Sequence, residues 1–214
     1  MNTQQATYES DDKEKHLDYA VRIFLPLDIW EIGLSYFDGT SREPLYNFDV
    51  GSNTFIPHYL QMQQVGLAAQ ATTNDWLWKI EAIHRDWQIE NFNAATAGFE
   101  YTFVGVFDSS ADIGWVAEYL YDDRGSNATS FLEHDLMIGL RLTVNDEATT
   151  EALLGFIVDK DTHDTIVSLE ANRRIGNSWR LSIEARAFNN IAGTSRLNAI
   201  RDDDYVQVEM GYYF

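Results

Sequence analysis

The side chains with the clearest chemical potential are histidines that stand beside carboxylates. His134 lies in the segment Glu133-His134-Asp135, and His163 lies in Asp161-Thr162-His163-Asp164. A carboxylate beside an imidazole suits general-base activation of water, and the same groups bind divalent metal ions. No ligand spacing such as His-x-x-x-His appears, so ordinary solvated loops explain these residues more simply. We therefore expect no catalytic residue, no metal site and no cofactor.

The composition excludes several other kinds of chemistry. The 214 residues include 34 acidic and 15 basic side chains, and the net charge of -19 argues against nucleic acid as a partner. The absence of cysteine excludes disulfides, zinc–thiolate sites and thiol catalysis. A hydrophobic content of 45% with 14% aromatic residues indicates a folded chain. No run approaches the roughly 18 apolar residues of a membrane helix.

The elements that position these side chains are predicted to be β-strands, because apolar and polar residues alternate with a period of two. The alternation predicts about eleven strands, most near the 9–11 residues of a tilted membrane-spanning strand. One slip of phase, at Gln63-Gln64, is typical of a β-bulge. The predicted strands cover residues 17–25, 30–36, 57–71, 76–85, 99–107, 112–121, 136–144, 151–159, 165–174, 179–187 and 205–214.

Two kinds of all-β protein share this alternation. In a soluble barrel or sandwich the apolar face points inward, whereas in an outer-membrane barrel it points at lipid and the polar face lines the lumen. Aromatic residues near the predicted strand ends favour the membrane, because amphipathic rings gather at the bilayer interface. These residues are Trp30, Tyr36, Trp76, Trp78, Trp115, Tyr119, Tyr121, Trp179, Tyr212 and Phe214.

The lengths of the predicted connections also favour the membrane. Long or moderate loops alternate with short turns, as expected when long loops are external and short turns periplasmic. The predicted loops are 38–56, 86–97, 122–132, 160–164 and 189–203, and the predicted turns are 26–28, 72–75, 108–112, 145–149 and 174–178. The chain has no linker or composition break. We therefore expect a polar N-terminal segment or external loop over 1–15 and a single β-barrel domain over 16–214.

The last segment resembles the C-terminal assembly signal of bacterial outer-membrane β-barrels. That signal has a terminal Phe, an aromatic residue two positions earlier and apolar residues at alternate positions before it. Here the matching residues are Val206, Val208, Met210, Tyr212 and Phe214. The segments 118–125 and 184–188 are similar to uncharacterised porin-like proteins of marine proteobacteria. The resemblance implies a Gram-negative outer-membrane protein inserted by the barrel-assembly machinery, with membrane lipid and lipopolysaccharide around it.

The predicted number of strands is odd, which leaves the total size of the barrel open. Residues 1–15 contain no secretory signal, and eleven strands conflict with the even counts of bacterial single-chain barrels. We expect either a C-terminal portion of a larger barrel or a twelve-stranded barrel whose short first strand lies within residues 1–9. The fold class is therefore predicted as an antiparallel up-and-down transmembrane β-barrel with about 11–12 strands in this chain.

The predicted polar face carries charges of both signs. A water-filled channel for small polar solutes and a salt-bridged plug both use such a face. Arg180, Glu184 and Arg186 form the densest group. The selectivity candidates are Lys79, Glu81, Arg85, Glu100, Arg141, Glu170, Arg180, Glu184, Arg186 and Glu209.

We expect a porin-like channel for passive diffusion of small polar solutes. Three alternatives stay open. One is a plugged structural or surface-binding barrel. Another is a rim hydrolase that uses His134 or His163, as in outer-membrane proteases of the omptin type. The last is a soluble β-barrel that binds an apolar ligand. The oligomeric state is left open.

Overall fold

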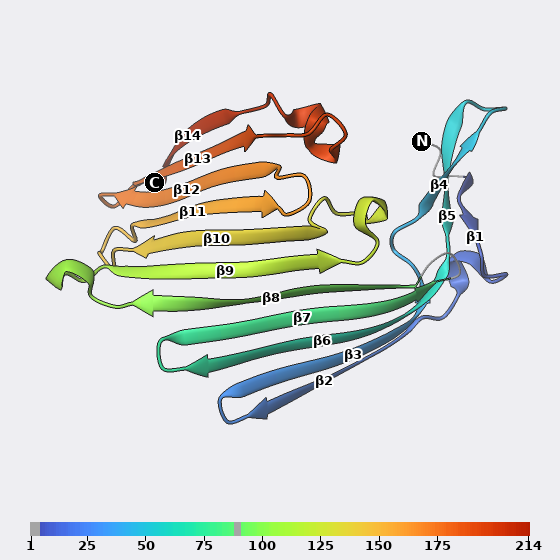
Figure 1. The fold of residues 1–214 in the computed structure, drawn as a ribbon, viewed down its shortest axis with the longest axis horizontal. Helices are drawn as coiled ribbons and strands as arrows, with labels where there is room; N and C mark the ends of the chain where they lie inside the picture. The colour runs from blue at the N-terminus through green and yellow to red at the C-terminus, as the bar shows by residue number, and fades with distance from the viewer. Residues whose placement is uncertain (1–4, 88–90) are drawn as a thin grey trace. The chain divides into compact units, whose positions relative to one another are not determined.

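The computed structural model describes residues 5–87 and 91–214, and almost all of its regular structure is β-strand (Figure 1). The chain divides into two compact units. The first comprises Met1–Ala69 and Glu81–Ala94, and the second comprises Gln70–Ile80 and Ala95–Phe214. The predicted all-β, antiparallel class is therefore confirmed, and the division of the chain between residues 15 and 16 stays a prediction.

Eleven of the described strands follow one another in a single sheet with the order β14-β13-β12-β11-β10-β9-β8-β7-β6-β3-β2. These are the eleven segments that the alternation predicts, apart from differences at their ends. Their bounds are β2 Tyr19–Leu27, β3 Trp30–Thr40, β6 Gln61–Thr73, β7 Trp76–Trp87, β8 Phe92–Phe103, β9 Asp112–Asp122, β10 His134–Thr143, β11 Glu151–Asp159, β12 Thr165–Ile175, β13 Trp179–Asn189 and β14 Tyr205–Tyr212.

The first unit contains a small sheet that the sequence did not predict. Its strands are β1 Thr7–Tyr8, β4 Leu45–Asp49 and β5 Thr54–Tyr59, in the order β1-β5-β4. β1 pairs in parallel with β5, so the described residues 5–9 do not supply a twelfth strand of the large sheet, and the rest of the predicted segment 1–9 lies outside the described residues. Residues 57–71 are not one strand either. The chain leaves β5 at Tyr59 and begins β6 at Gln61, whose backbone amide donates to the Glu9 carboxylate at 2.6 Å.

Two connections differ from the sequence prediction. Residues 92–98 form the first half of β8 and not part of a long loop, because Phe92 is buried and its ring lies 6.4 Å from that of Trp87. At its other end β8 stops at Phe103, since Gly105 adopts a left-handed conformation (φ 64°) and begins a turn. Phe107 therefore lies in a short 3-10 helix and is almost fully exposed, instead of continuing the strand.

Short 3-10 helices occupy several connections. They are η2 Lys13–Lys15, η3 Val106–Asp108, η4 Gly125–Asn127 and η5 Arg196–Ile200. The loops 123–133 and 190–204 carry η4 and η5, and the hydroxyl of Ser195 caps η5 by accepting from the backbone amide of Leu197 at 3.1 Å. The alternation of long loops and short turns is thus less regular than predicted, because the connection 104–111 is eight residues long where a short turn was expected.

Within the second unit, β9 to β14 form an antiparallel meander (Figure 1). The register places Leu136, Ile138 and Leu140 of β10 between Tyr119, Ala117 and Trp115 of β9 and Val158, Phe156 and Leu154 of β11. The predicted division into two faces is confirmed across these strands. The apolar face of the second unit consists of Trp115, Ala117, Tyr119, Leu136, Ile138, Leu140, Leu142, Leu154, Phe156, Val158, Val167, Leu169, Leu181, Ile183, Ala185, Val206, Val208, Met210 and Tyr212.

The apolar face is exposed. Leu140 keeps 49% of its accessible surface and Val208 keeps 64%, so the face is not the covered interior of a sandwich. The hydrophobic residues that are buried among the described residues are few and mostly scattered singly: Leu60, Ala71, Phe92, Val116, Ala128, Ile166 and Leu197. Hydrogen bonds along the ladders, more than a packed core, hold this unit together.

Gly98 marks a close approach between β8 and β9. A Cβ at this position would collide with the carbonyl oxygen of Ala117 and lie 2.9 Å from the Cα of Glu118. We expect Gly98→Ala to lower the free energy of unfolding by about 1–3 kcal/mol, because the backbone of β9 must move. A denaturant titration followed by tryptophan fluorescence measures the loss. The control is Gly193→Ala, where a Cβ would meet nothing within 4 Å. Equal stability of the two variants would contradict the close approach.

Candidate functional site

The second unit holds a cavity of about 630 Å³ on the face opposite the apolar one. β10 to β14 all contribute to its lining, because their alternate residues point to the same side. The polar face, as we call this side, gives the cavity its charged lining: Arg141, Glu151, Glu170, Arg180, Glu184 and Glu209. Five of these six are predicted selectivity residues, and Glu151 is an addition to the predicted set.

The ladders explain how these side chains come together. Glu170 of β12 stands directly opposite Glu184 of β13, and Glu184 is in turn opposite Gln207 of β14. One step along the same face, Ser182 stands opposite both Asn172 and Glu209. The carboxylates therefore occupy two neighbouring rows that cross the strands.

Arginines border these rows and compensate only part of the charge. The guanidinium of Arg141 donates to the Glu100 carboxylate at 2.9 Å, so this pair is locally neutral. Arg186 lies 3.8 Å from Glu184, which also accepts a hydrogen bond from the Tyr205 hydroxyl. Arg180 lies opposite Arg174 in a further row, which is nearer the turn between β12 and β13. The predicted group of Arg180, Glu184 and Arg186 is thus spread over three rows.

The remaining predicted charges lie elsewhere. Lys79 belongs to the second unit and Glu81 to the first, and both are exposed on β7. Arg85 lies in the first unit, where its Nε donates to Gln64 and its Nη1 to Glu43, both at 2.8 Å. The guanidinium also stacks 5.2 Å from the ring of Phe92. Arg85 is therefore held by its own neighbours within its unit.

The residues of the predicted assembly signal share one face of β14. Val206, Val208 and Met210 stand opposite Ala185, Ile183 and Leu181 of β13, and the ring of Tyr212 lies 4.8 Å from that of Trp179. Phe214 follows the strand and is fully exposed, with its ring 6.2 Å from Tyr212. This arrangement continues the apolar face to the end of the chain.

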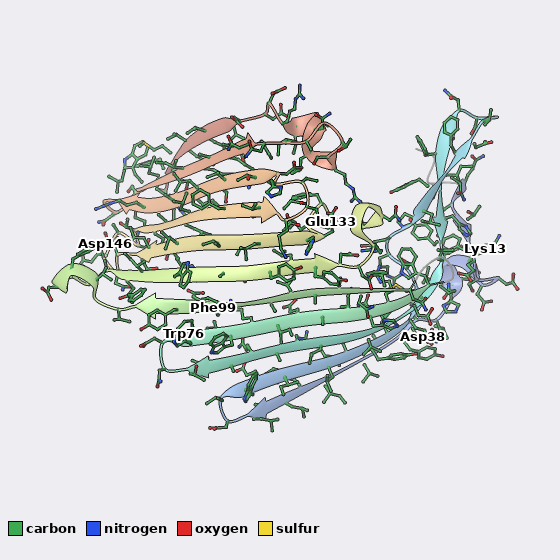
Figure 2. All side chains as sticks on the ribbon, in the orientation of Figure 1. Lys13, Asp38, Trp76, Phe99, Glu133 and Asp146 are labelled. Carbon is green, nitrogen blue, oxygen red and sulfur yellow. The ribbon has the colours of Figure 1, made fainter. Side chains whose placement is uncertain are left out.

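Aromatic rings gather on the apolar side of the second unit. Trp76 and Trp78 stack at 5.2 Å, and Trp76 also lies 5.2 Å from Phe99 on the neighbouring strand. Figure 2 labels Trp76 and Phe99. Phe99 in turn meets Trp115 edge-on at 5.4 Å. At the opposite end of β9, His134 lies 5.8 Å from Tyr119. Rings therefore mark both ends of these strands.

The histidines with acidic neighbours do not assemble a hydrolytic site. The Nδ1 of His134 lies 2.8 Å from Asp161, and its Nε2 lies 3.4 Å from the Lys160 ammonium instead of a second carboxylate. His134 and Asp135 alternate along β10, so their side chains lie on opposite faces. His163 sits in the tight turn 160–164 with φ 63°. The geometry gives the omptin-like alternative no support.

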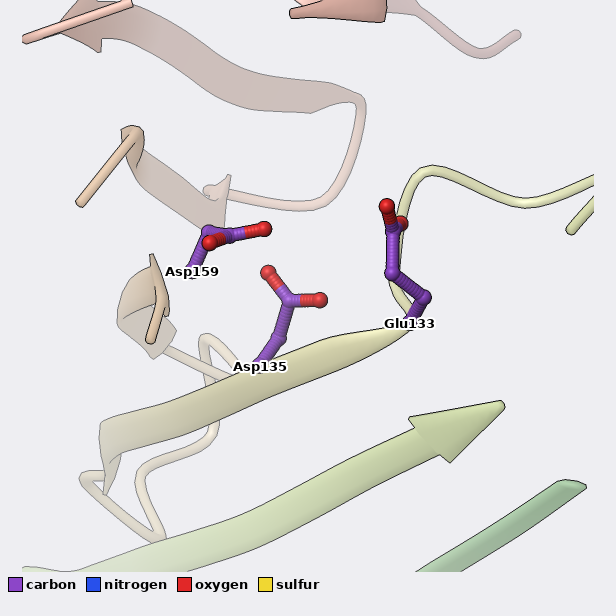
Figure 3. Close-up of side chains that lie close together, drawn as sticks. All are labelled: Glu133, Asp135 and Asp159. Atoms are coloured by element: carbon purple, nitrogen blue, oxygen red, sulfur yellow. The ribbon is translucent and has the colours of Figure 1, made fainter. Parts of the chain in front are cut away.

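A cluster of three carboxylates lies at the loop end of the polar face. Glu133, Asp135 and Asp159 each offer an oxygen within 4.8 Å of the others, as Figure 3 shows. Asp135 is buried and pairs in register with Asp159, which brings two distant parts of the sequence together. Carboxylate oxygens are the ligands that a hard divalent cation prefers. Sequence reasoning missed the cluster because only the β10–β11 register brings Asp159 to it.

The surroundings of this cluster control its charge. A cavity of about 270 Å³ adjoins it, lined also by Thr194, Ser195 and Arg196. Burial raises the pKa of the Glu133 carboxyl, Arg196 opposes the shift, and the charges of Asp159 and Asp135 add to it. The Glu133 Oε2 has no accessible surface and no hydrogen-bond partner among the described residues. Negative charge on Glu133 is therefore disfavoured in the fold.

No helix among the described residues has the length and apolar composition to cross a membrane. Comparison of the chain with protein-family models, curated proteins and solved structures gives no match.

The raised pKa of Glu133 predicts a pH-dependent effect of Glu133→Gln. A raised carboxyl pKa stabilises the fold fully below the ordinary value of 4.5 and ceases to do so as the pH rises through the folded value. At pH 7 we therefore expect the variant to unfold at higher denaturant than the wild type, with the gap shrinking towards pH 4. EDTA in the buffer keeps divalent cations off the three carboxylates. Glu147→Gln, at an exposed turn position, is the matched control and should show no such trend. A gap that widens on acidification would contradict the assignment.

Proposed function

We propose that this chain forms a transmembrane β-barrel of the Gram-negative outer membrane, a porin-like channel through which small polar solutes diffuse passively. The proposal includes closure of the sheet into a barrel. It also places membrane lipid and lipopolysaccharide around the barrel, and it names the barrel-assembly machinery as the route of insertion. The proposal needs no cofactor.

The observation that carries the proposal is the apolar face of the second unit. Leu136, Ile138, Leu140 and Leu142 of β10 each keep between 36% and 49% of their accessible surface, although none is a loop residue. Burying apolar surface contributes roughly 25 cal/mol per Å². A continuous apolar face over six strands therefore favours an apolar medium against it.

Three further features agree with lipid as that medium. β9 to β13 are 9–11 residues long, which matches the span of a tilted strand across a bilayer. Aromatic rings lie near both ends of the strands, where an interface would be. The opposite face is polar, which a water-filled lumen requires.

The soluble alternative needs the same apolar face to be covered by the chain itself. Trp179, Met210 and Val206 are all more than 40% exposed, so this face is not sealed by the described residues. An apolar ligand-binding barrel would also place its cavity on the apolar side. The cavity of about 630 Å³ instead has charged walls, and the apolar side carries a hollow of about 320 Å³ beside Val167, Leu169 and Val206.

The surroundings of the cavity support an open channel over a plug. Arg141 is neutralised by Glu100, which is the kind of pair a plug uses. Glu170 and Glu209, in contrast, have no ion pair within the described residues. A space of about 630 Å³ beside unpaired charges favours water and solutes in the lumen.

The test is refolding with and without detergent micelles, followed by planar-bilayer recording. We expect a band on gels that shifts on boiling and appears only with micelles, because the apolar face folds only against an apolar phase. Reconstituted protein should then conduct ions in steps.

Each other outcome has a distinct meaning. A folded monomer in plain buffer would overturn the membrane proposal in favour of the soluble barrel. A heat-shifted band without conductance would keep the membrane barrel and replace the channel by the plugged form.

A further inference from the structure

The charged lining of the large cavity is unbalanced. Four carboxylates and two guanidiniums face it, and one of those guanidiniums, that of Arg141, is already held by Glu100. The lining therefore presents an excess of negative charge to whatever enters the cavity.

Two of these carboxylates also face each other directly, although their like charges repel. Glu170 and Glu184 are direct partners in the β12–β13 ladder, and like charges directly opposite one another destabilise a sheet. Glu209 lies one row away, opposite Ser182, which is uncharged. In a salt-bridged plug we would expect an arginine opposite each of these carboxylates, in the way that Arg141 pairs with Glu100.

The arginines that could neutralise the rows lie beyond them on both sides. Arg180 faces Arg174 across the ladder, and this row of positive charge lies four residues along β12 from Glu170. Arg186 lies 3.8 Å from Glu184 and pairs with that carboxylate. Glu170 therefore has no ion pair among the described residues. The middle of the polar face is accordingly negative.

We infer that the polar face of β11 to β14 selects small cationic solutes, with Glu170, Glu184 and Glu209 as the residues that determine the preference. This inference rests on the proposed channel function. Their carboxylates attract a passing cation and repel an anion, and they line a cavity of about 630 Å³.

The size of the preference follows from Coulomb's law with screening. Two uncompensated charges about 7 Å from a passing ion, in water with about 0.1 M salt, favour a monovalent cation over an anion by about five- to tenfold. Removing both charges should bring the ratio close to one.

The experiment is the permeability ratio of K⁺ to Cl⁻, obtained from the zero-current potential of the refolded full chain in a KCl gradient across a planar bilayer. The wild type should prefer K⁺ by about five- to tenfold, and Glu170→Gln with Glu209→Gln, which removes the two charges without an ion pair among the described residues, should lose most of that preference. Arg180→Gln should raise the preference, which tests the sign independently.

The matched control is Asp202→Asn with Asp203→Asn, which removes the same charge from the exposed loop 190–204 and should leave the ratio near that of the wild type. Each variant is first checked for the heat-shifted band. Conductance without cation preference, or a preference that survives the double Gln variant, would overturn the inference and leave the channel proposal standing. Absence of conductance in the wild type would instead defeat the channel proposal itself.

Discussion

The structure depends on one constraint: each strand from β9 to β14 must keep an apolar face on one side and a polar face on the other. Alternate residues of a strand point to opposite sides, and the ladders from β9 to β14 keep this alternation in phase. A shift of one residue in any ladder would place a residue such as Arg141 or Glu184 among leucines. The cost of such a misplaced charge is what specifies the register.

The same constraint shapes the polar face. Because the charged residues of β9 to β14 other than Arg173 stand at alternate positions, neighbouring strands bring them into rows, and each row has its own net charge. Glu100 and Arg141 form a neutral pair, whereas Glu170 meets Glu184 and Arg174 meets Arg180. The row of Asn172, Ser182 and Glu209 separates these two rows, so the face has an electrostatic pattern that the total number of charges does not reveal.

The sequence predicts the strands and their faces well where one residue type dominates each face. The period of two alone was enough to predict the strands and the faces of 136–142 and 206–212. The prediction was wrong where side chains are small, as in Ala94 to Gly98, because such residues show no hydrophobic contrast although their backbone pairs normally. The small sheet of the first unit was missed for a related reason: β4 and β5 are short and lie within a polar loop region.

The candidate sites were predicted only in part, because a site depends on register as well as on side-chain type. Glu170, Glu184 and Glu209 were placed on the correct face, but their arrangement in rows separate from Arg180 requires knowing which residues are partners. The carboxylate cluster needs the pairing of Asp135 with Asp159, which are 24 positions apart and joined by no sequence motif. Alternation determines the face, and long-range pairing determines the neighbours.

The most direct test of the two-medium account is a cysteine scan along β13, which the cysteine-free chain permits without background. Single cysteines at positions 181 to 186 would carry a nitroxide, in protein refolded into lipid vesicles. Collisions with oxygen, which concentrates in lipid, should peak at 181, 183 and 185, and collisions with an aqueous nickel chelate should peak at 182, 184 and 186. Two profiles of period two in opposite phase would support the account, whereas equal accessibility at neighbouring positions, or apolar positions shielded from both reagents, would contradict it.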